Sequence, residues 1–312
     1  MQAADEPDFS YDGDALSARL DEAFSAMFDR ECAALWVATG TAANCLALAS
    51  MVPPEGAAVC HRDAHIEGDE CGAPGFFLHG AKLLPAGGDG AKLTPETIAA
   101  VIDPIPDDVH RAQPHAVSIT QASELGRVYA LAELDALSGF VTERGLKLHV
   151  DGARFANAVA HLDCAPAEAC SGADALSFGF VKNGGMGAEA IVFFDPAAAE
   201  MIRYRRKRAG HLQSKGRYLA AQILALLEND LWLENARAAN AAAQEIAASA
   251  KGRLMQPVEV NEVFLELSEA ECAVLRDRGF GFYARKGGAR FVTSWNSRPE
   301  HVAALAGAIA SL

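Results

Sequence analysis

The sequence of 312 residues is poor in basic residues and has no long basic run. Lys and Arg together number 27 against 41 Asp and Glu, which gives a formal net charge of −14 at pH 7. A chain this acidic is repelled by nucleic acid phosphates and by anionic lipid surfaces. The one basic cluster, residues 203–208, is short. We therefore expect neither nucleic acid nor a membrane as a partner.

Long apolar runs and paired cysteines are also missing. No stretch approaches the roughly 18 apolar residues of a transmembrane helix. The first residues are acidic and lack the basic and then apolar pattern of a signal peptide. The seven cysteines are scattered and form no C-x-x-C pair. We expect reduced thiols in a cytoplasmic protein, without a disulfide or zinc framework.

Short apolar runs alternate with helical patterns through the first two thirds of the chain. This alternation predicts a mostly parallel sheet covered by helices on both faces, an α/β fold. Asp14 and Thr94 are expected to cap helices, Thr94 with a proline after it. The predicted strands are residues 33–37, 57–60, 116–120, 146–150 and 173–178. The predicted helices include 15–28, a helical run that follows residues 38–44 and ends at about 50, and 131–144.

The composition changes after residue 210. Residues 210–250 are alanine-rich and predict helices. Predicted strands follow at 263–267, 281–283 and 290–295, with helices at 269–278 and 299–309. We therefore expect a large domain at 1–209, followed by linking helices and a small α+β domain at 210–312.

The most informative stretch is residues 147–194. Asp151 ends one apolar run, and Lys182 follows the next one, just before a glycine-rich turn. A lysine desolvated by Phe178, Phe180 and Val181 would be a good nucleophile. A carboxylate and a lysine placed in this way suit pyridoxal 5′-phosphate (PLP), where the aspartate holds the pyridine nitrogen protonated. A surface lysine and a helix-capping aspartate are the alternatives.

Two further stretches follow predicted strands. Gly40 and Thr41 lie between a strand and a helix start, where unpaired N–H groups can bind a phosphate, although an ordinary turn has the same pattern. The polar stretch 61–70 contains His61 and His65, which would share a face if they were helical. That is half of a zinc site. A histidine stacked on an aromatic cofactor, or a structural histidine, is favoured over a metal, and we expect no metal site.

Taken together, the motifs resemble the threonine aldolase/β-eliminating lyase family of fold-type I (aspartate aminotransferase-like) PLP enzymes, in its bacterial low-specificity L-threonine aldolase branch. The resemblance runs from about Tyr11 to the C-terminus. It rests most on the combination of D-G-A-R at 151–154 with K-N-G at 182–184. The other matching segments are 40–44, 64–66, 69–72, 120–126 and 290–294.

The resemblance implies a role for each matching residue. Lys182 forms the Schiff base with PLP, Asp151 pairs with the pyridine nitrogen and His65 stacks on the ring. Arg154 and Arg290 bind the substrate carboxylate, in a pocket to which Tyr11 and Glu124 also belong. Gly40 and Thr41 bind the phosphate, and Arg154 also contacts the cofactor. In a homodimer or homotetramer, Lys207 could reach the phosphate of a neighbouring subunit, although the basic segment around it could equally be a solvated helix end.

The implied reaction is retro-aldol cleavage of L-threonine or L-allo-threonine to glycine and acetaldehyde. Three groups remain open as the base: His65, Glu124 or a water molecule. Another PLP-dependent lyase reaction such as β-elimination, a non-catalytic PLP-fold protein, and a zinc hydrolase built on His61 and His65 are the alternative functions. Family chains begin with a strand-like segment that contributes a serine near the substrate carboxylate. This chain starts after that segment, so we expect weaker substrate binding than in a full-length relative.

Overall fold

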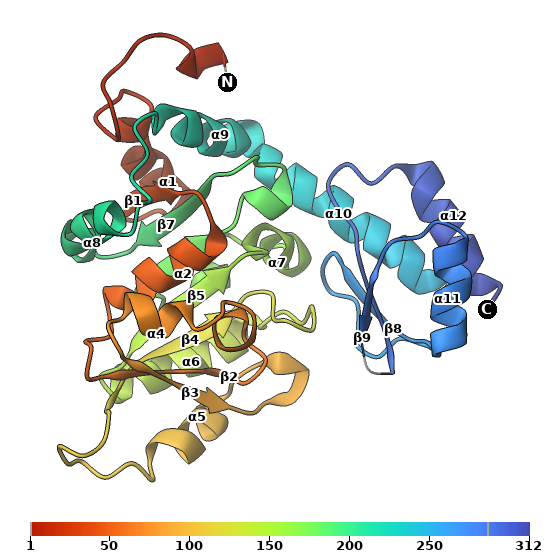
Figure 1. Ribbon diagram of the computed structural model, residues 1–312, viewed down its shortest axis with the longest axis horizontal. Coiled ribbons are helices and arrows are strands. Elements are labelled where there is room, and N and C mark those ends of the chain that lie inside the picture. Colours follow the sequence, from red (N-terminus) through yellow and green to blue (C-terminus); the bar gives the residue numbers. More distant parts are fainter. Residues whose placement is uncertain (1, 286) are drawn as a thin grey trace.

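A sheet of seven strands forms the centre of the larger part of the computed structural model, which describes residues 2–285 and 287–312 (Figure 1). The strand order is β1-β7-β6-β5-β4-β2-β3. Strand β7 is antiparallel to both its neighbours, and the other pairings are parallel. The strands are β1 (Ala33–Val37), β2 (Ala57–His61), β3 (Lys82–Ala86), β4 (Pro114–Thr120), β5 (Lys147–Gly152), β6 (Ala175–Phe178) and β7 (Glu189–Phe193).

Helices cover both faces of this sheet, as the apolar strands predict. Strand β1 shows why, because Ala34 and Trp36 pack into one hydrophobic cluster while Leu35 and Val37 pack into another on the opposite face. The helices of this part are α1 (Leu20–Phe28), α2 (Gly40–Ala49), α3 (His65–Gly68), α4 (Ala73–Phe77), α5 (Pro95–Ile102), α6 (Leu131–Glu143), α7 (Phe155–Leu162), α8 (Pro196–Arg208) and α9 (Arg217–Leu227). Single 3₁₀ turns are η1 (Gln2–Ala4), η2 (Ser17–Arg19), η3 (Asp89–Ala91), η4 (Glu168–Cys170), η5 (Val181–Asn183) and η6 (Glu228–Asp230).

The two predicted helix caps differ in outcome. Thr94 caps α5 and forms a capping box with Thr97, as predicted. Asp14 accepts hydrogen bonds from the backbone and side chain of Ser17, but the turn after it is the 3₁₀ turn η2. The predicted helix at 15–28 is therefore wrong at its start, and α1 begins at Leu20.

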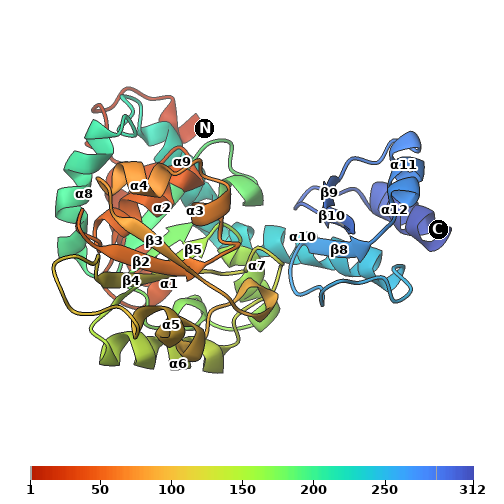
Figure 2. The same cartoon turned by 60° about the horizontal axis from the view of Figure 1, so that its bottom comes forward.

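A long helix, α10 (Leu231–Ala248), leads from the large sheet to a smaller C-terminal part, as Figure 2 shows from a second side. There a three-stranded antiparallel sheet, in the order β8-β10-β9, packs with two helices. These elements are β8 (Glu262–Glu266), α11 (Glu269–Asp277), β9 (Tyr283–Arg285), β10 (Gly288–Val292) and α12 (Pro299–Ala310).

The predicted strand bounds in this part are shifted. Strand β8 lies one residue before the predicted 263–267, β9 covers Tyr283–Arg285 rather than 281–283, and β10 covers Gly288–Val292 rather than 290–295. Just past the end of β10, the hydroxyl of Thr293 donates to Ala239 O, in α10, at 2.7 Å. The predicted domain division at 209/210 stays a prediction. Helix α9 packs against β1 and β7, and the C-terminal hydrophobic cluster starts at Ala243.

Within the described residues, no helix combines the length and the apolar character needed to cross a lipid bilayer.

Candidate active site

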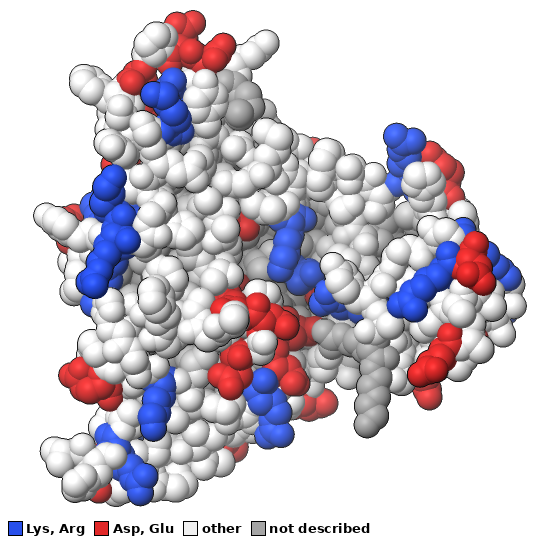
Figure 3. Space-filling view, viewed as in Figure 1, with Lys and Arg blue, Asp and Glu red and all other residues white. Residues whose placement is uncertain are grey.

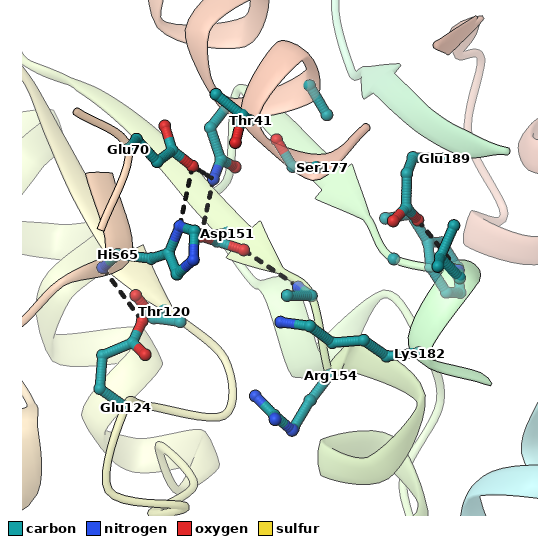
Figure 4. Close-up of a pocket in the computed structure, with 17 residues that line it drawn as sticks. Thr41, His65, Glu70, Thr120, Glu124, Asp151, Arg154, Ser177, Lys182 and Glu189 are labelled. Atoms are coloured by element: carbon teal, nitrogen blue, oxygen red, sulfur yellow. Dashed lines mark hydrogen bonds and ion pairs between the residues drawn. The ribbon is translucent and has the colours of Figure 1, made fainter. Parts of the chain in front are cut away.

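A cavity of about 180 Å³ opens beside the ends of β4, β5 and β6 and the first turn of α2. The carboxyl ends of parallel strands commonly carry ligand-binding residues in open α/β sheets. Figure 4 shows side chains from these strand ends and from the loops after them converging on one space. Seven residues singled out in the sequence line this cavity: Gly40, Thr41, His65, Glu124, Asp151, Arg154 and Lys182.

Asp151 is held at the end of β5 by two hydrogen bonds. Asn44 Nδ2, on α2, donates to Asp151 Oδ2 at 2.8 Å, and Ala153 N donates to Asp151 Oδ1 at 3.0 Å. The residue is 4% exposed. Beneath it, the ring of His149 lies between two serine hydroxyls, and burial lowers its pKa to about 4. His149 is therefore neutral at pH 7, and the carboxylate of Asp151 is left to pair with a cation in the cavity.

His65 stands at the start of α3 in contact with two carboxylates. Its Nδ1 donates to Glu70 Oε1 at 3.0 Å, and its backbone N–H donates to Glu124 Oε1 at 3.1 Å. Asn44 Nδ2 also donates to Glu70 Oε1, at 3.1 Å, so one amide links Glu70 to Asp151. The hydrogen bond to Glu70 raises the pKa of His65, although burial opposes this.

This contact gives a first prediction. We expect Glu70→Gln to lower the pKa of His65, because the burial that remains disfavours the imidazolium ion. Nuclear magnetic resonance titration of the ring protons measures the pKa, and the spectrum of His65→Asn identifies the His65 signal among the nine histidines. An unchanged pKa in Glu70→Gln would show that Glu70 does not control the protonation of His65.

The structure corrects the suggestion that His61 and His65 share a helix face. His61 ends β2, whereas His65 begins α3. Both ring nitrogens of His61 are engaged, Nε2 with Gly88 O at 3.1 Å and Nδ1 with the N–H of Asp63 at 3.1 Å. Among residues 2–285 and 287–312 there is no group of three or more His, Cys, Asp and Glu side chains that could hold a metal ion.

Lys182 lies in η5, the turn after β6, and its side chain extends toward Asp151 (Figure 4). Burial of the amine lowers the pKa of Lys182, and the positive charge of the nearby Arg154 also lowers it. Glu189, buried on β7, holds this turn because its Oε2 accepts the N–H groups of Phe180 at 2.5 Å and Val181 at 3.3 Å. Burial raises the pKa of Glu189 to about 7. The turn therefore presents an amine of lowered basicity, which suits a nucleophile.

The first turn of α2 leaves room for an anion. Thr39 caps the helix by accepting the N–H of Ala42 at 3.2 Å. A Cβ atom added to Gly40 would meet nothing within 4 Å, so the space in front of the helix start is open. The first N–H groups of a helix and its dipole favour negative charge at this place.

Arg154 and Arg290 approach the cavity from different parts of the chain. Arg154 follows β5 and donates from Nε to Asn261 Oδ1 at 3.1 Å. Arg290 lies on β10 and is not among the residues that line the cavity. One buried carboxylate, Glu262, pairs with both arginines. In Figure 3, Lys and Arg side chains gather next to Asp and Glu side chains in the hollow between the two parts of the molecule.

Tyr11 and Lys207 are not among the residues that line this cavity. The Lys207 amine lies 4.6 Å from the centre of the Tyr11 ring, and the neighbouring Arg206 pairs with Asp12. Both residues belong to the region around the basic end of α8. Their predicted roles in binding substrate and cofactor stay predictions.

The residues of the cavity fit PLP. The carboxylate of Asp151, fixed by Asn44, suits a protonated pyridine nitrogen, and the open helix start at Gly40 suits a phosphate. Asn44 Oδ1 is buried and has no hydrogen-bond partner among the described residues, so one hydrogen-bond acceptor beside Asp151 remains available to a ligand. Lys182 supplies an amine of lowered pKa at the same cavity.

Comparison with known proteins agrees with this geometry. Residues 1–270 match the family model described as β-eliminating lyase. The chain belongs to the β-eliminating lyase family. Low specificity L-threonine aldolases of a Pseudomonas species and of Pseudomonas aeruginosa are each 45% identical to it over 305 residues, which cover 95% of this chain and 88% of each relative.

A solved structure also resembles this β-eliminating lyase family member. The threonine aldolase of Leishmania major superposes with a TM-score of 0.93 at 25% identity, covering 99% of this chain and 92% of that one. The predicted fold-type I architecture, the predicted family and the assignment as a threonine aldolase-type lyase are confirmed. Membership of this family implies PLP as the cofactor and an amino acid as the substrate.

Sequence reasoning gave no role to four buried polar residues that shape the site: Asn44, Glu70, Glu189 and Glu262. Asn44 and Glu70 lie inside matching motifs. A polar residue in an apolar helix was the signal for Asn44, whereas Glu70 belongs to the polar stretch 61–70 and lies in the loop after α3. Glu189 and Glu262 each stand at the start of an apolar strand run. A charge at such a position is the pattern that could have drawn attention to them.

Proposed function

We propose that this β-eliminating lyase family member is a PLP-dependent low-specificity threonine aldolase that cleaves L-threonine and L-allo-threonine to glycine and acetaldehyde. The observation that carries the proposal is the presence of Lys182, Asp151, His65 and Arg154 around one cavity of a chain that is 45% identical to threonine aldolases. A homodimer or homotetramer and a cytoplasmic location stay predictions.

Each cavity residue has a distinct task in holding the cofactor. Lys182 would carry PLP covalently through its amine, which its lowered pKa favours. Asp151 would hold the ring nitrogen protonated, His65 would stack on the ring, and Gly40 and Thr41 would bind the phosphate. When bound, PLP supplies the electron sink for the pair released as the bond between Cα and Cβ breaks.

The remaining residues bind and orient the substrate. Arg154 and Arg290 would hold the α-carboxylate, because a guanidinium can offer two parallel N–H groups to a carboxylate. The β-hydroxyl must lose a proton as the bond breaks. Glu124, His65 and Glu70 are titratable groups on the side of the cavity opposite Lys182 (Figure 4), and we take Glu124 and His65 as the candidate bases. Glu70 keeps Nδ1 of His65 engaged, so only Nε2 of that ring is free to exchange a proton.

The test is aldehyde release by the PLP-loaded protein. We expect acetaldehyde from L-threonine and L-allo-threonine, measured by coupling to alcohol dehydrogenase and NADH. Ammonia and a keto acid in place of aldehyde and glycine would show β-elimination instead. Release of neither product from any β-hydroxy amino acid would contradict an enzymatic role.

A further inference from the structure

We propose that Glu262 is a positioning residue for the substrate carboxylate. Its carboxylate ties Arg154 of the large part to Arg290 of the C-terminal part, and so makes the two guanidinium groups converge on one anion. The inference rests on the proposed function, because it takes these arginines as the carboxylate-binding pair.

The contacts of Glu262 are unusual for a buried acid. Its side chain is fully buried, and Oε1 lies 3.1 Å from Arg154 Nη2 and 3.5 Å from Arg290 Nη1. Neither oxygen has a hydrogen-bond partner among the described residues. A buried carboxylate without hydrogen bonds is costly and is held by its neighbouring cations alone. The site therefore keeps a charge that contributes little to stability, which points to a role in function.

The β8–β10 register places Glu262 next to Arg290. Glu262 faces Val292 across the pair, so Arg290, two residues back on β10, is its diagonal neighbour on the same face of the sheet. Arg154 reaches the same point from the large part, where Asn261 Oδ1 accepts its Nε–H. Asn261 and Glu262, which are adjacent in the C-terminal part, thus contact Nε and Nη2 of the same guanidinium group, that of Arg154.

A nearby acid with a purely structural task provides a contrast. Glu259 also joins the two parts, but its oxygens accept well-formed hydrogen bonds from Arg127 Nε at 2.9 Å and from Val128 N at 2.6 Å. It is not among the residues that line the cavity. Glu259→Gln is therefore a matched control, because it weakens contact between the parts without touching the arginine pair.

The charges at the arginine pair are also matched to the substrate. Two guanidinium ions and one carboxylate leave a net charge of +1, which the single α-carboxylate of an amino acid neutralises. Without Glu262, the two partly buried cations repel each other with no carboxylate between them, and the pair separates. Binding of the carboxylate should then weaken selectively, while binding of the amine and the chemistry at the β-carbon are affected less.

The experiment compares the binding of glycine with that of glycinamide, which lacks the carboxylate. Isothermal titration calorimetry on PLP-loaded protein gives both dissociation constants. We expect wild type and Glu259→Gln to prefer glycine, and Glu262→Gln to lower that preference by about 30-fold or more, in line with the loss of one partner of a buried charge pair. General damage to the fold would weaken both ligands alike and leave their ratio unchanged.

A ratio that stays constant or rises in Glu262→Gln would overturn the proposal, as would an equal fall in Glu259→Gln. If Glu262→Gln does not fold, Glu262→Asp keeps the charge but withdraws it by one methylene and should give an intermediate ratio. Wild type that binds both ligands equally would overturn the carboxylate site itself, whatever the aldehyde assay shows. Failure of that assay with the glycine preference intact would count against the proposed reaction alone.

Discussion

Replacing Lys182 by alanine should abolish both aldehyde release and the yellow colour of the PLP-loaded protein. Lys182 is the only lysine that lines the cavity within the described residues, and its lowered pKa favours the neutral amine. Without it, the protein has no residue there that can bind the cofactor covalently and exchange it for the substrate amine. We expect the rate to fall on the order of 10⁶-fold, as for deletion of the nucleophile in another enzyme.

Two variants make this expectation specific. Lys182→Arg keeps a positive charge near Asp151 but cannot form the covalent bond, so it should be as inactive as Lys182→Ala. Lys215→Ala removes an exposed lysine and should leave colour and rate unchanged. Visible absorbance and the coupled assay measure both properties. Retained absorbance in Lys182→Ala would contradict the assignment, because another amine would then hold PLP.

Much of the fold followed from local pattern. Residues 33–37 form a strand with the predicted bounds because five apolar residues in a row can only be buried between two layers of helices. Asp151 and Lys182 could be identified because both follow apolar runs, and the ends of neighbouring parallel strands meet at one edge of the sheet.

The rest depended on contacts between distant residues. Glu262 pairs with Arg154, 108 positions away, and this contact depends on α10, which leads from the large part to the C-terminal part beside it (Figure 1). Glu189 is similar, since its partners are backbone N–H groups whose direction is fixed by a turn after another strand. Local patterns give neither the register of a sheet nor the direction of a loop, so such residues look like ordinary strand ends.

Replacing Glu124 by glutamine should lower kcat/KM by about 10²- to 10⁴-fold, the usual range for loss of a general base. Glu124 lines the cavity, and its Oε1 is tied to the backbone N–H of His65. Burial and, after it, the negative charge of Asp151 raise the pKa of Glu124 to about 7, while the charge of Arg154 opposes them. A carboxylate that titrates near the working pH is well suited to accept the proton of the β-hydroxyl.

The sign of the pH effect follows from this raised pKa. The base must be ionised, so kcat/KM of wild type should fall about tenfold for each pH unit below about 7. At the ordinary glutamate pKa of 4.5 the fall would begin far lower. In Glu124→Gln the acid limb should disappear, and Glu67→Gln, an exposed neighbour, should keep the wild-type profile. If the limb persists in Glu124→Gln at the wild-type pH, another cavity group with a raised pKa produces it. His65 is then favoured as the base over Glu189, because Glu189 Oε2 already accepts two backbone N–H groups of the turn that carries Lys182.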